Sequence, residues 1–163
     1  MKIYSLERTE NFPISRKEAW NFFSNPTNLP KITPAELSLR ISDGGLGEIY
    51  PGMIITYTVT PVFRIRWRWA TEITHVKAPA YFVDEQRFGP YRFWHHQHFF
   101  VSTEAGTEVR DLIHYALPFG PAGSIVHSWL VRKRLEHIFD FRSVSLRRMF
   151  GDLRAGTAGC ILR

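Results

Sequence analysis

The last long segment of the chain constrains its fold more than any other. Residues 121–150 begin with a proline and contain no glycine after Gly123 and no further proline. As a continuous helix the segment would be about 40 Å long, enough to cross a small domain. At about 100° per residue its large apolar side chains gather on one broad face, among them Ile125, Trp129, Leu135, Phe139 and Leu146. A helix with such a face needs a large apolar surface to pack against.

The middle of the chain alternates apolar and polar residues, which predicts strands rather than helices. The expected strands are residues 2–10, 36–42, 53–60, 63–69, 81–87, 91–101 and 107–117. In residues 63–69 arginines alternate with large apolar residues, so we expect one solvated and one buried face. The later strands are joined by short turns at Gly89-Pro90 and Ala105-Gly106, which favours an antiparallel meander.

Two short helices are expected after the first strand. Ser15 precedes an apolar stretch, and Glu18 follows it at the spacing of a capping box, which predicts a helix from Arg16 to Ser24. Asn25-Pro26 ends this helix, and a further helical turn is expected in residues 27–32.

These elements predict an α+β fold. A strongly curved antiparallel sheet of about six or seven strands would wrap around the long C-terminal helix, with the two short helices after strand 1. In a chain of 163 residues we expect a single domain over residues 1–150 and a flexible tail over the Gly- and Ala-rich residues 151–163.

Charge and cysteine usage narrow the partners and the compartment. The net charge is +6, but the basic residues are scattered, and the densest run, residues 132–134, is balanced by Glu136 and Asp140. We therefore expect a solvated helix face and no nucleic-acid partner. No apolar run is long enough to insert into a membrane. Cys160 is the only cysteine, which is typical of a reducing compartment, so a cytoplasmic location is expected.

Several runs, with the order of the elements, carry a resemblance to a known superfamily. The runs are residues 82–86, 89–91, 94–100, 106–111 and 115–118, followed by a helix containing Leu135 and Phe139. Over about residues 2–150 the chain resembles the START-like, or SRPBCC, superfamily, which includes the birch-pollen-allergen type and the polyketide cyclases/dehydrases. It looks like a bacterial, ligand-binding-type member. The resemblance implies a helix-grip fold with a hydrophobic cavity between sheet and helix, where many members hold a lipid, sterol, polyketide or other apolar metabolite.

Alternation along three strands predicts which polar residues reach such a cavity. His96 and His98 share one face of their strand, as do Asp84 and Gln86 on theirs and Asp111 and Tyr115 on theirs. If these faces point inward, a few polar groups converge among aromatic rings, as in a small-molecule site. The predicted ligand-binding residues are Trp20, Trp67, Asp84, Gln86, Trp94, His96, His98, Asp111, Tyr115 and Phe139. The alternative is a hydrogen-bonded network in a solid core.

The His96-x-His98 spacing also permits a metal site, with a third ligand from Asp84, Glu85 or Asp111. Hydrogen bonds from both imidazoles to neighbouring strands explain the pair as well. We therefore predict no metal and no other cofactor.

Catalysis is a further possibility. His96 or His98 would act as the base and Tyr115 as the proton donor, with Arg132 or Arg142 steadying an enolate. The sequence has no Gly-x-Ser-x-Gly elbow and no phosphate-binding loop. Whether the chain is an enzyme is left open, with binding favoured over turnover.

Three functions follow from these observations. The first is binding, transport or sequestration of a hydrophobic or aromatic small molecule in an internal cavity. The second is a polyketide cyclase- or aromatase-like enzyme that uses the same cavity. The third is a protein-interaction module in which side chains fill the core.

Overall fold

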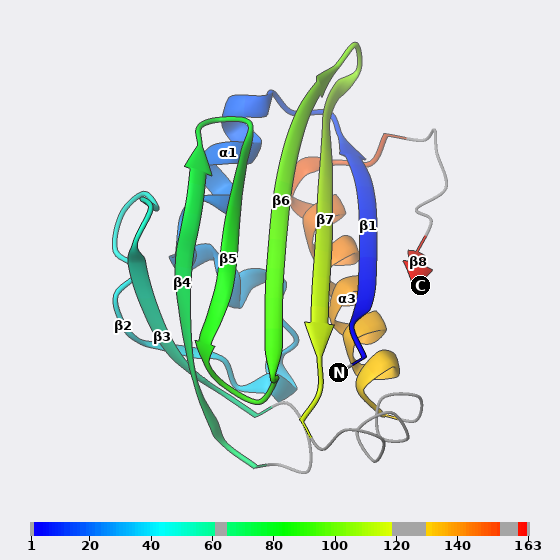
Figure 1. Ribbon diagram of the computed structural model, residues 1–163. Helices are drawn as coiled ribbons and strands as arrows, with labels where there is room; N and C mark the ends of the chain where they lie inside the picture. The colour runs from blue at the N-terminus through cyan, green and yellow to red at the C-terminus, as the bar shows by residue number, and fades with distance from the viewer. Residues whose placement is uncertain (1, 61–64, 119–129, 154–159, 163) are drawn as a thin grey trace.

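The computed structural model describes residues 2–60, 65–118, 130–153 and 160–162. Strands β1 to β7 make up most of the regular secondary structure, and α3 is the longest helix in the described part of the chain (Figure 1). In chain order the elements are β1 (Tyr4–Phe12), α1 (Arg16–Phe23), the 3-10 helices η1 (Pro26–Ile32) and η2 (Ala35–Leu37), β2 (Arg40–Asp43), β3 (Met53–Val59), β4 (Trp67–Lys77), β5 (Tyr81–Phe88), β6 (Phe93–Thr103), β7 (Gly106–Ala116), α3 (Arg132–Phe150) and β8 (Cys160–Leu162).

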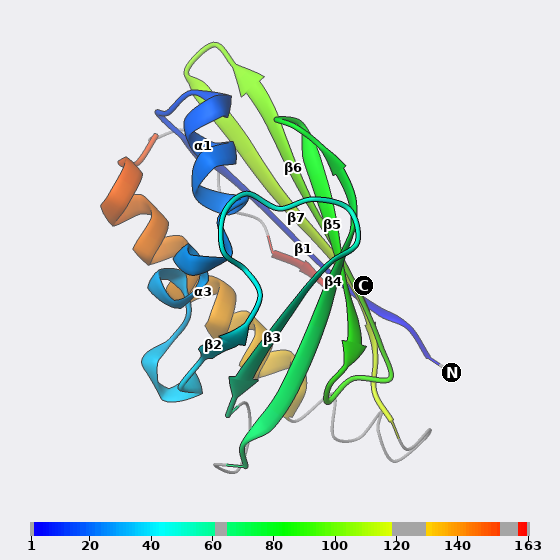
Figure 2. The same ribbon diagram turned by 90° about the vertical axis from the view of Figure 1, so that its left-hand side faces the viewer.

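The strands form one antiparallel sheet in the order β2-β3-β4-β5-β6-β7-β1-β8. Strands β2 to β7 follow one another both along the chain and across the sheet, as a meander, and β1 pairs with β7. Figure 2 shows that α1, the two 3-10 helices and α3 all lie on the same side of this curved sheet. The predicted fold class, a curved antiparallel sheet around a long C-terminal helix with short helices after strand 1, is confirmed.

The local signals around α1 explain its position. The side chain of Ser15 accepts from the backbone N–H of Glu18, and the Glu18 carboxylate accepts from the backbone of Ser15, which completes the predicted capping box. The helix buries Ala19 and Trp20 against the sheet. The next turn is a 3-10 helix rather than an α-helix, and it brings η1 against α3.

Helix α3 packs its apolar face onto the sheet at helical spacing. Leu135, Phe139 and Leu146 are each less than 5% exposed. Leu135 and Phe139 pack against β1 and β7, while Leu146 joins a second cluster that contains Phe12 and Phe100. The predicted helix over residues 121–150 is therefore observed from Arg132 onward. Its first part, residues 121–129, lies outside the described residues.

Two strand predictions need correction. β4 begins at Trp67 and continues to Lys77, well beyond the predicted end at residue 69, and residues 63–64 of that prediction lie outside the described part. The side chains expected to be buried there, Ile65 and Trp67, are 53% and 40% exposed. The reason is pairing: Trp67 pairs with β3, but the pairing of β4 with β5 starts only at Ala70. This end of β4 therefore lacks a strand on one side.

The predicted strand over residues 36–42 is divided. A 3-10 turn occupies Ala35–Leu37, and Ser38 has a left-handed backbone (φ 45°), so extended pairing starts only at Arg40. In the predicted tail, the structure describes residues 151–153 and 160–162, and the latter pair with β1 as β8. The flexibility of this tail stays a prediction. No helix in the described part of the chain is long and apolar enough to cross a membrane.

Candidate functional pocket

A pocket of about 220 Å³ lies between the sheet, η1 and α3. Each layer contributes apolar side chains to its wall. They include Phe23, Leu29 and Ile32 from the α1–η1 region, Ile55 and Trp69 from the sheet, and Leu135, Ile138 and Phe139 from α3. The pocket is therefore lined mainly by aliphatic groups and rings, as small-molecule sites are.

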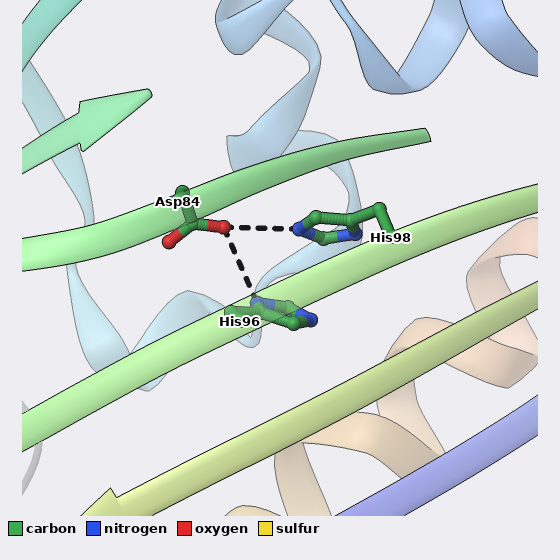
Figure 3. Close-up of side chains that lie close together, drawn as sticks. All are labelled: Asp84, His96 and His98. Atoms are coloured by element: carbon green, nitrogen blue, oxygen red, sulfur yellow. Dashed lines mark hydrogen bonds and ion pairs between the residues drawn. The ribbon is translucent and has the colours of Figure 1, made fainter. Parts of the chain in front are cut away.

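The polar groups of the pocket are concentrated on the sheet. Asp84 of β5 stands opposite His96 of β6 in the strand register, and His98 follows two residues later on the same face. Figure 3 shows the Asp84 carboxylate pointing at both imidazoles. Oδ1 of Asp84 lies 3.0 Å from Nε2 of His98 and 3.5 Å from Nδ1 of His96. All three residues line the pocket.

A second carboxylate, that of Asp111, contacts the ring nitrogens of His96 and His98 that do not face Asp84. Asp111 of β7 pairs with His98 in the register. Its Oδ1 accepts a hydrogen bond from Nε2 of His96 at 3.0 Å. The same oxygen lies 2.7 Å from Nδ1 of His98, but off the direction of a hydrogen bond, so this contact is electrostatic. Arg142 of α3 reaches Oδ2 of Asp111 at 3.5 Å and lies over the ring of Phe139.

The pKa shifts of Asp84 and Asp111 favour the ionised form of both carboxylates. Burial opposes ionisation of Asp111, but the positive charge of His98 and the hydrogen bond from His96 outweigh it and hold the pKa well below its usual value. Burial likewise opposes ionisation of Asp84, yet His96 and His98 lower its pKa. Both carboxylates are therefore ionised.

The two histidines are shifted in opposite directions. Burial and the neighbouring charge of His98 lower the pKa of His96. For His98, burial is outweighed by Asp111 and Asp84, which raise its pKa. Of the two imidazoles, His98 therefore holds a proton more readily, and with Arg142 it places positive charge beside the two buried carboxylates.

A tyrosine extends the polar wall toward β3. The hydroxyl of Tyr57 lies 2.5 Å from Oγ1 of Thr71, and both residues line the pocket. Burial, with a contribution from the negative charge of Asp84, raises the pKa of Tyr57. Its hydroxyl therefore stays protonated and can donate a hydrogen bond.

The structure brings together half of the predicted ligand-binding residues. Those that line the pocket are Asp84, Trp94, His96, His98 and Phe139. Asp111 lies directly behind the histidines. The other four lie elsewhere, each for a reason that the structure makes clear.

Trp20 is buried in the core against Phe82 and Phe100, and its indole N–H donates to Glu48 at 2.8 Å. Trp67 is on the exposed end of β4.

Gln86 instead connects the two ends of the β5–β6 turn. Its amide donates to the backbone carbonyl of Tyr91 and accepts from the Tyr91 N–H. Tyr115 is fully buried among Tyr4, Tyr91 and Trp94. It is not part of the pocket wall, so it lies away from the position expected of a proton donor.

Sequence reasoning missed several wall residues, and one signal was available. Ile55, Tyr57 and Val59 alternate along β3 and all face the pocket, so the period-two pattern of residues 53–59 would have identified them. Leu29 and Ile32 of η1 also line the pocket, but no sequence periodicity predicted this. Which side chains of such a short 3-10 helix face the pocket depends on how the helix packs against the rest of the fold.

Comparisons with known proteins support the fold. No family model and no curated protein matches the sequence. Several solved structures match over most of the chain. A protein from Mycobacterium smegmatis is 18% identical, with a TM-score of 0.63 over 89% of this chain and 92% of that chain. Ara h 8.0201 is 14% identical, with a TM-score of 0.60 over 89% and 99% of the two chains.

A norcoclaurine synthase variant from Thalictrum flavum, in complex with a transition-state analogue, is 16% identical over 91% of this chain and 97% of that chain, with a TM-score of 0.62. The fold is the START-like helix-grip fold. The predicted resemblance is thereby confirmed for the fold. At these identities the comparisons do not assign a ligand or a reaction.

Proposed function

We propose that this chain binds a small hydrophobic or aromatic molecule in the pocket between the sheet and α3. The observation that carries the proposal is the pocket itself: apolar walls from three layers, with a polar wall of Tyr57, Asp84, His96 and His98 on one side. Such a distribution suits a ligand with an apolar body and one polar end. The fold supports the same conclusion, because START-like proteins in general bind hydrophobic ligands.

The volume suggests the size of the ligand. A dry apolar cavity of about 150 Å³ accommodates benzene. A pocket of about 220 Å³ therefore favours a compact molecule of one or two rings over a long acyl chain. The polar end would be a hydroxyl, carbonyl or amine, because Tyr57 supplies a donor and Asp84 an acceptor.

The pocket also argues against the interaction-module alternative, which requires a filled core. A cytoplasmic location remains part of the proposal.

Isothermal titration with 1-naphthol tests this function. The molecule has two fused rings and one hydroxyl, and it represents the proposed ligand class. Ile55→Phe would fill part of the pocket, because Ile55 is 5% exposed and lines it. Ile54→Phe is the matched control, since Ile54 is the next residue of β3, faces the other side of the sheet and is 47% exposed.

We expect 1-naphthol to bind the unmodified protein with one site. Ile55→Phe should weaken binding at least about tenfold, which corresponds to about 1.4 kcal/mol. Ile54→Phe should leave binding unchanged. The proposal is wrong if 1-naphthol and related one- and two-ring compounds do not bind, or if both substitutions weaken binding equally.

The cyclase-like alternative is favoured by one feature, the carboxylate-supported histidines in the pocket wall. His96, with its lowered pKa, is neutral and available as a base. Product formation from a linear poly-β-ketone, followed by mass spectrometry, would reveal turnover. This alternative requires turnover that His96→Ala abolishes. His95→Ala, on the opposite face of β6, should leave such turnover intact.

A further inference from the structure

Although the sequence alone led us to predict no metal, we propose from the structure that Asp84, His96 and His98 form a binding site for one divalent transition-metal ion, with an open coordination position toward the pocket. The three residues lie on one face of two adjacent strands, and their ligand atoms all lie within 4.8 Å of one another (Figure 3). The same three residues belong to the polar wall of the pocket described above, but the test of the metal site needs no organic ligand.

The distances between the side chains suit a metal ion. With metal–ligand bonds of about 2.0–2.1 Å, the ligand atoms of a tetrahedral site lie about 3.3 Å apart. Oδ1 of Asp84 is 3.0 Å from Nε2 of His98 and 3.5 Å from Nδ1 of His96. An ion would therefore replace these contacts with small side-chain movements. The strands hold the side chains in place, since Asp84 and His96 are directly paired.

Asp111 contacts both imidazoles, as an outer carboxylate does in metal sites. Its Oδ1 contacts Nε2 of His96 and Nδ1 of His98, which are the ring nitrogens not directed at Asp84. Histidines that bind metal usually present their second nitrogen to such a carboxylate, which fixes the ring. Arg142 in turn contacts Oδ2 of Asp111. The fold thus supplies both the three ligand side chains and a carboxylate that contacts the second nitrogen of each imidazole.

The hydrogen bond to Asp111 also determines which nitrogen of His96 is available. A carboxylate only accepts, so Nε2 of His96 donates to Asp111. Nδ1 of the same ring lies 3.5 Å from Oδ1 of Asp84, and a cation between these two atoms would contact both.

The ligand set indicates the class of ion. Two imidazoles and one carboxylate suit Zn²⁺, Fe²⁺ or Co²⁺ rather than Ca²⁺ or Mg²⁺, which prefer oxygen ligands. Three protein ligands leave a position open, as in catalytic rather than structural sites. The open position faces the pocket, so the polar end of a bound molecule would reach the ion. This last step rests on the proposed function.

Cobalt spectroscopy tests the site directly. Chelator-treated protein without an affinity tag is titrated with Co²⁺, whose four- and five-coordinate complexes absorb in the visible range. We expect a band that saturates at one ion per chain and is displaced by Zn²⁺. His96→Gln and Asp84→Asn should each weaken binding at least about 100-fold. Asp111→Asn should weaken it about 10- to 100-fold, because the neutral amide no longer supports the His96 ring as the carboxylate does.

His95→Gln is the matched control, because His95 lies on the other face of β6 and contacts Glu85. It should bind Co²⁺ like the unmodified protein. In unmodified protein, ¹⁵N spectra should show the ring nitrogens of His96 and His98 shifting with Zn²⁺, which tests the site even if a substitution prevents folding.

Three results would overturn the metal site. The first is that no Co²⁺ band appears and that calorimetry detects no heat of Zn²⁺ binding up to about 1 mM metal. The second is unchanged metal binding in folded His96→Gln and Asp84→Asn, and the third is ¹⁵N shifts only at other histidines. The last would identify an adventitious surface ion. Any of these leaves the naphthol titration untouched, so failure of the metal site and failure of the proposed ligand site are distinguishable.

Discussion

Phe139 connects the long helix to the pocket, and truncating it measures how much that contact stabilises the fold. The ring is 3% exposed, lines the pocket and packs edge-on against His96. Phe139→Ala would remove this contact and the stacking of Arg142 on the ring. Phe141→Ala, two residues along α3, is the matched control because that ring is 37% exposed.

The magnitude follows from the burial of each ring. Truncating a buried phenylalanine to alanine costs about 3–5 kcal/mol, and the better helix propensity of alanine returns about 0.5 kcal/mol. Phe139→Ala should therefore destabilise the protein by about 2.5–4.5 kcal/mol. Phe141→Ala receives the same gain in propensity and loses little packing, so its change should stay within about 0.5 kcal/mol.

Urea denaturation measures both changes, with tryptophan fluorescence and far-ultraviolet circular dichroism as independent probes. With a slope of about 2 kcal/mol/M, Phe139→Ala should lower the midpoint by more than about 1 M without changing the slope. If the two substitutions differ by less than about 1 kcal/mol, α3 does not close the pocket as described, and the packing argument is refuted.

Three further predictions concern single residues, each measured by urea denaturation. Gly44→Ala should lower the free energy of unfolding by at least about 2 kcal/mol more than Gly47→Ala does. Both glycines have left-handed backbones, but only at Gly44 would a Cβ lie 2.3 Å from the carbonyl oxygen of Ile54, and equal losses would contradict this reasoning. Asp111→Ala should cost about 3–5 kcal/mol, since the buried guanidinium of Arg142 loses its carboxylate partner; a cost under about 1 kcal/mol would show that the cluster is not buried. Ser15→Ala should cost about 1 kcal/mol by removing the cap of α1, and no loss would mean that the cap is not formed in solution.

Much of the fold was predictable because its signals are local. The β6–β7 hairpin has a short turn and pairs without interruption from Phe93–Ala116 to Thr103–Gly106. The alternation along each strand therefore survives in the folded protein, and His96, His98 and Asp111 share the inward face as the pattern suggested. The capping box at Ser15 is local in the same way.

The parts that could not be predicted depend on distant partners. The exposure of Trp67 follows from the absence of β5 pairing at that end of β4, which no local pattern encodes. Both Trp20 and Trp94 were expected in the pocket, yet only Trp94 lines it, because α1 packs Trp20 against Phe82 and Phe100. The identity of pocket residues is thus set by how helices dock on the sheet.

Methyl NMR with 1-naphthol tests the central claim most directly. The methyl groups of Ile55, Leu135 and Ile138 come from the sheet and from α3 and line one pocket, whereas Ile54 lies on the far face of β3. Binding in the pocket predicts that the first three shift together along one saturation curve while Ile54 stays unchanged. If the pocket methyls do not move at saturating ligand, or Ile54 moves with them, the ligand does not bind between the sheet and α3.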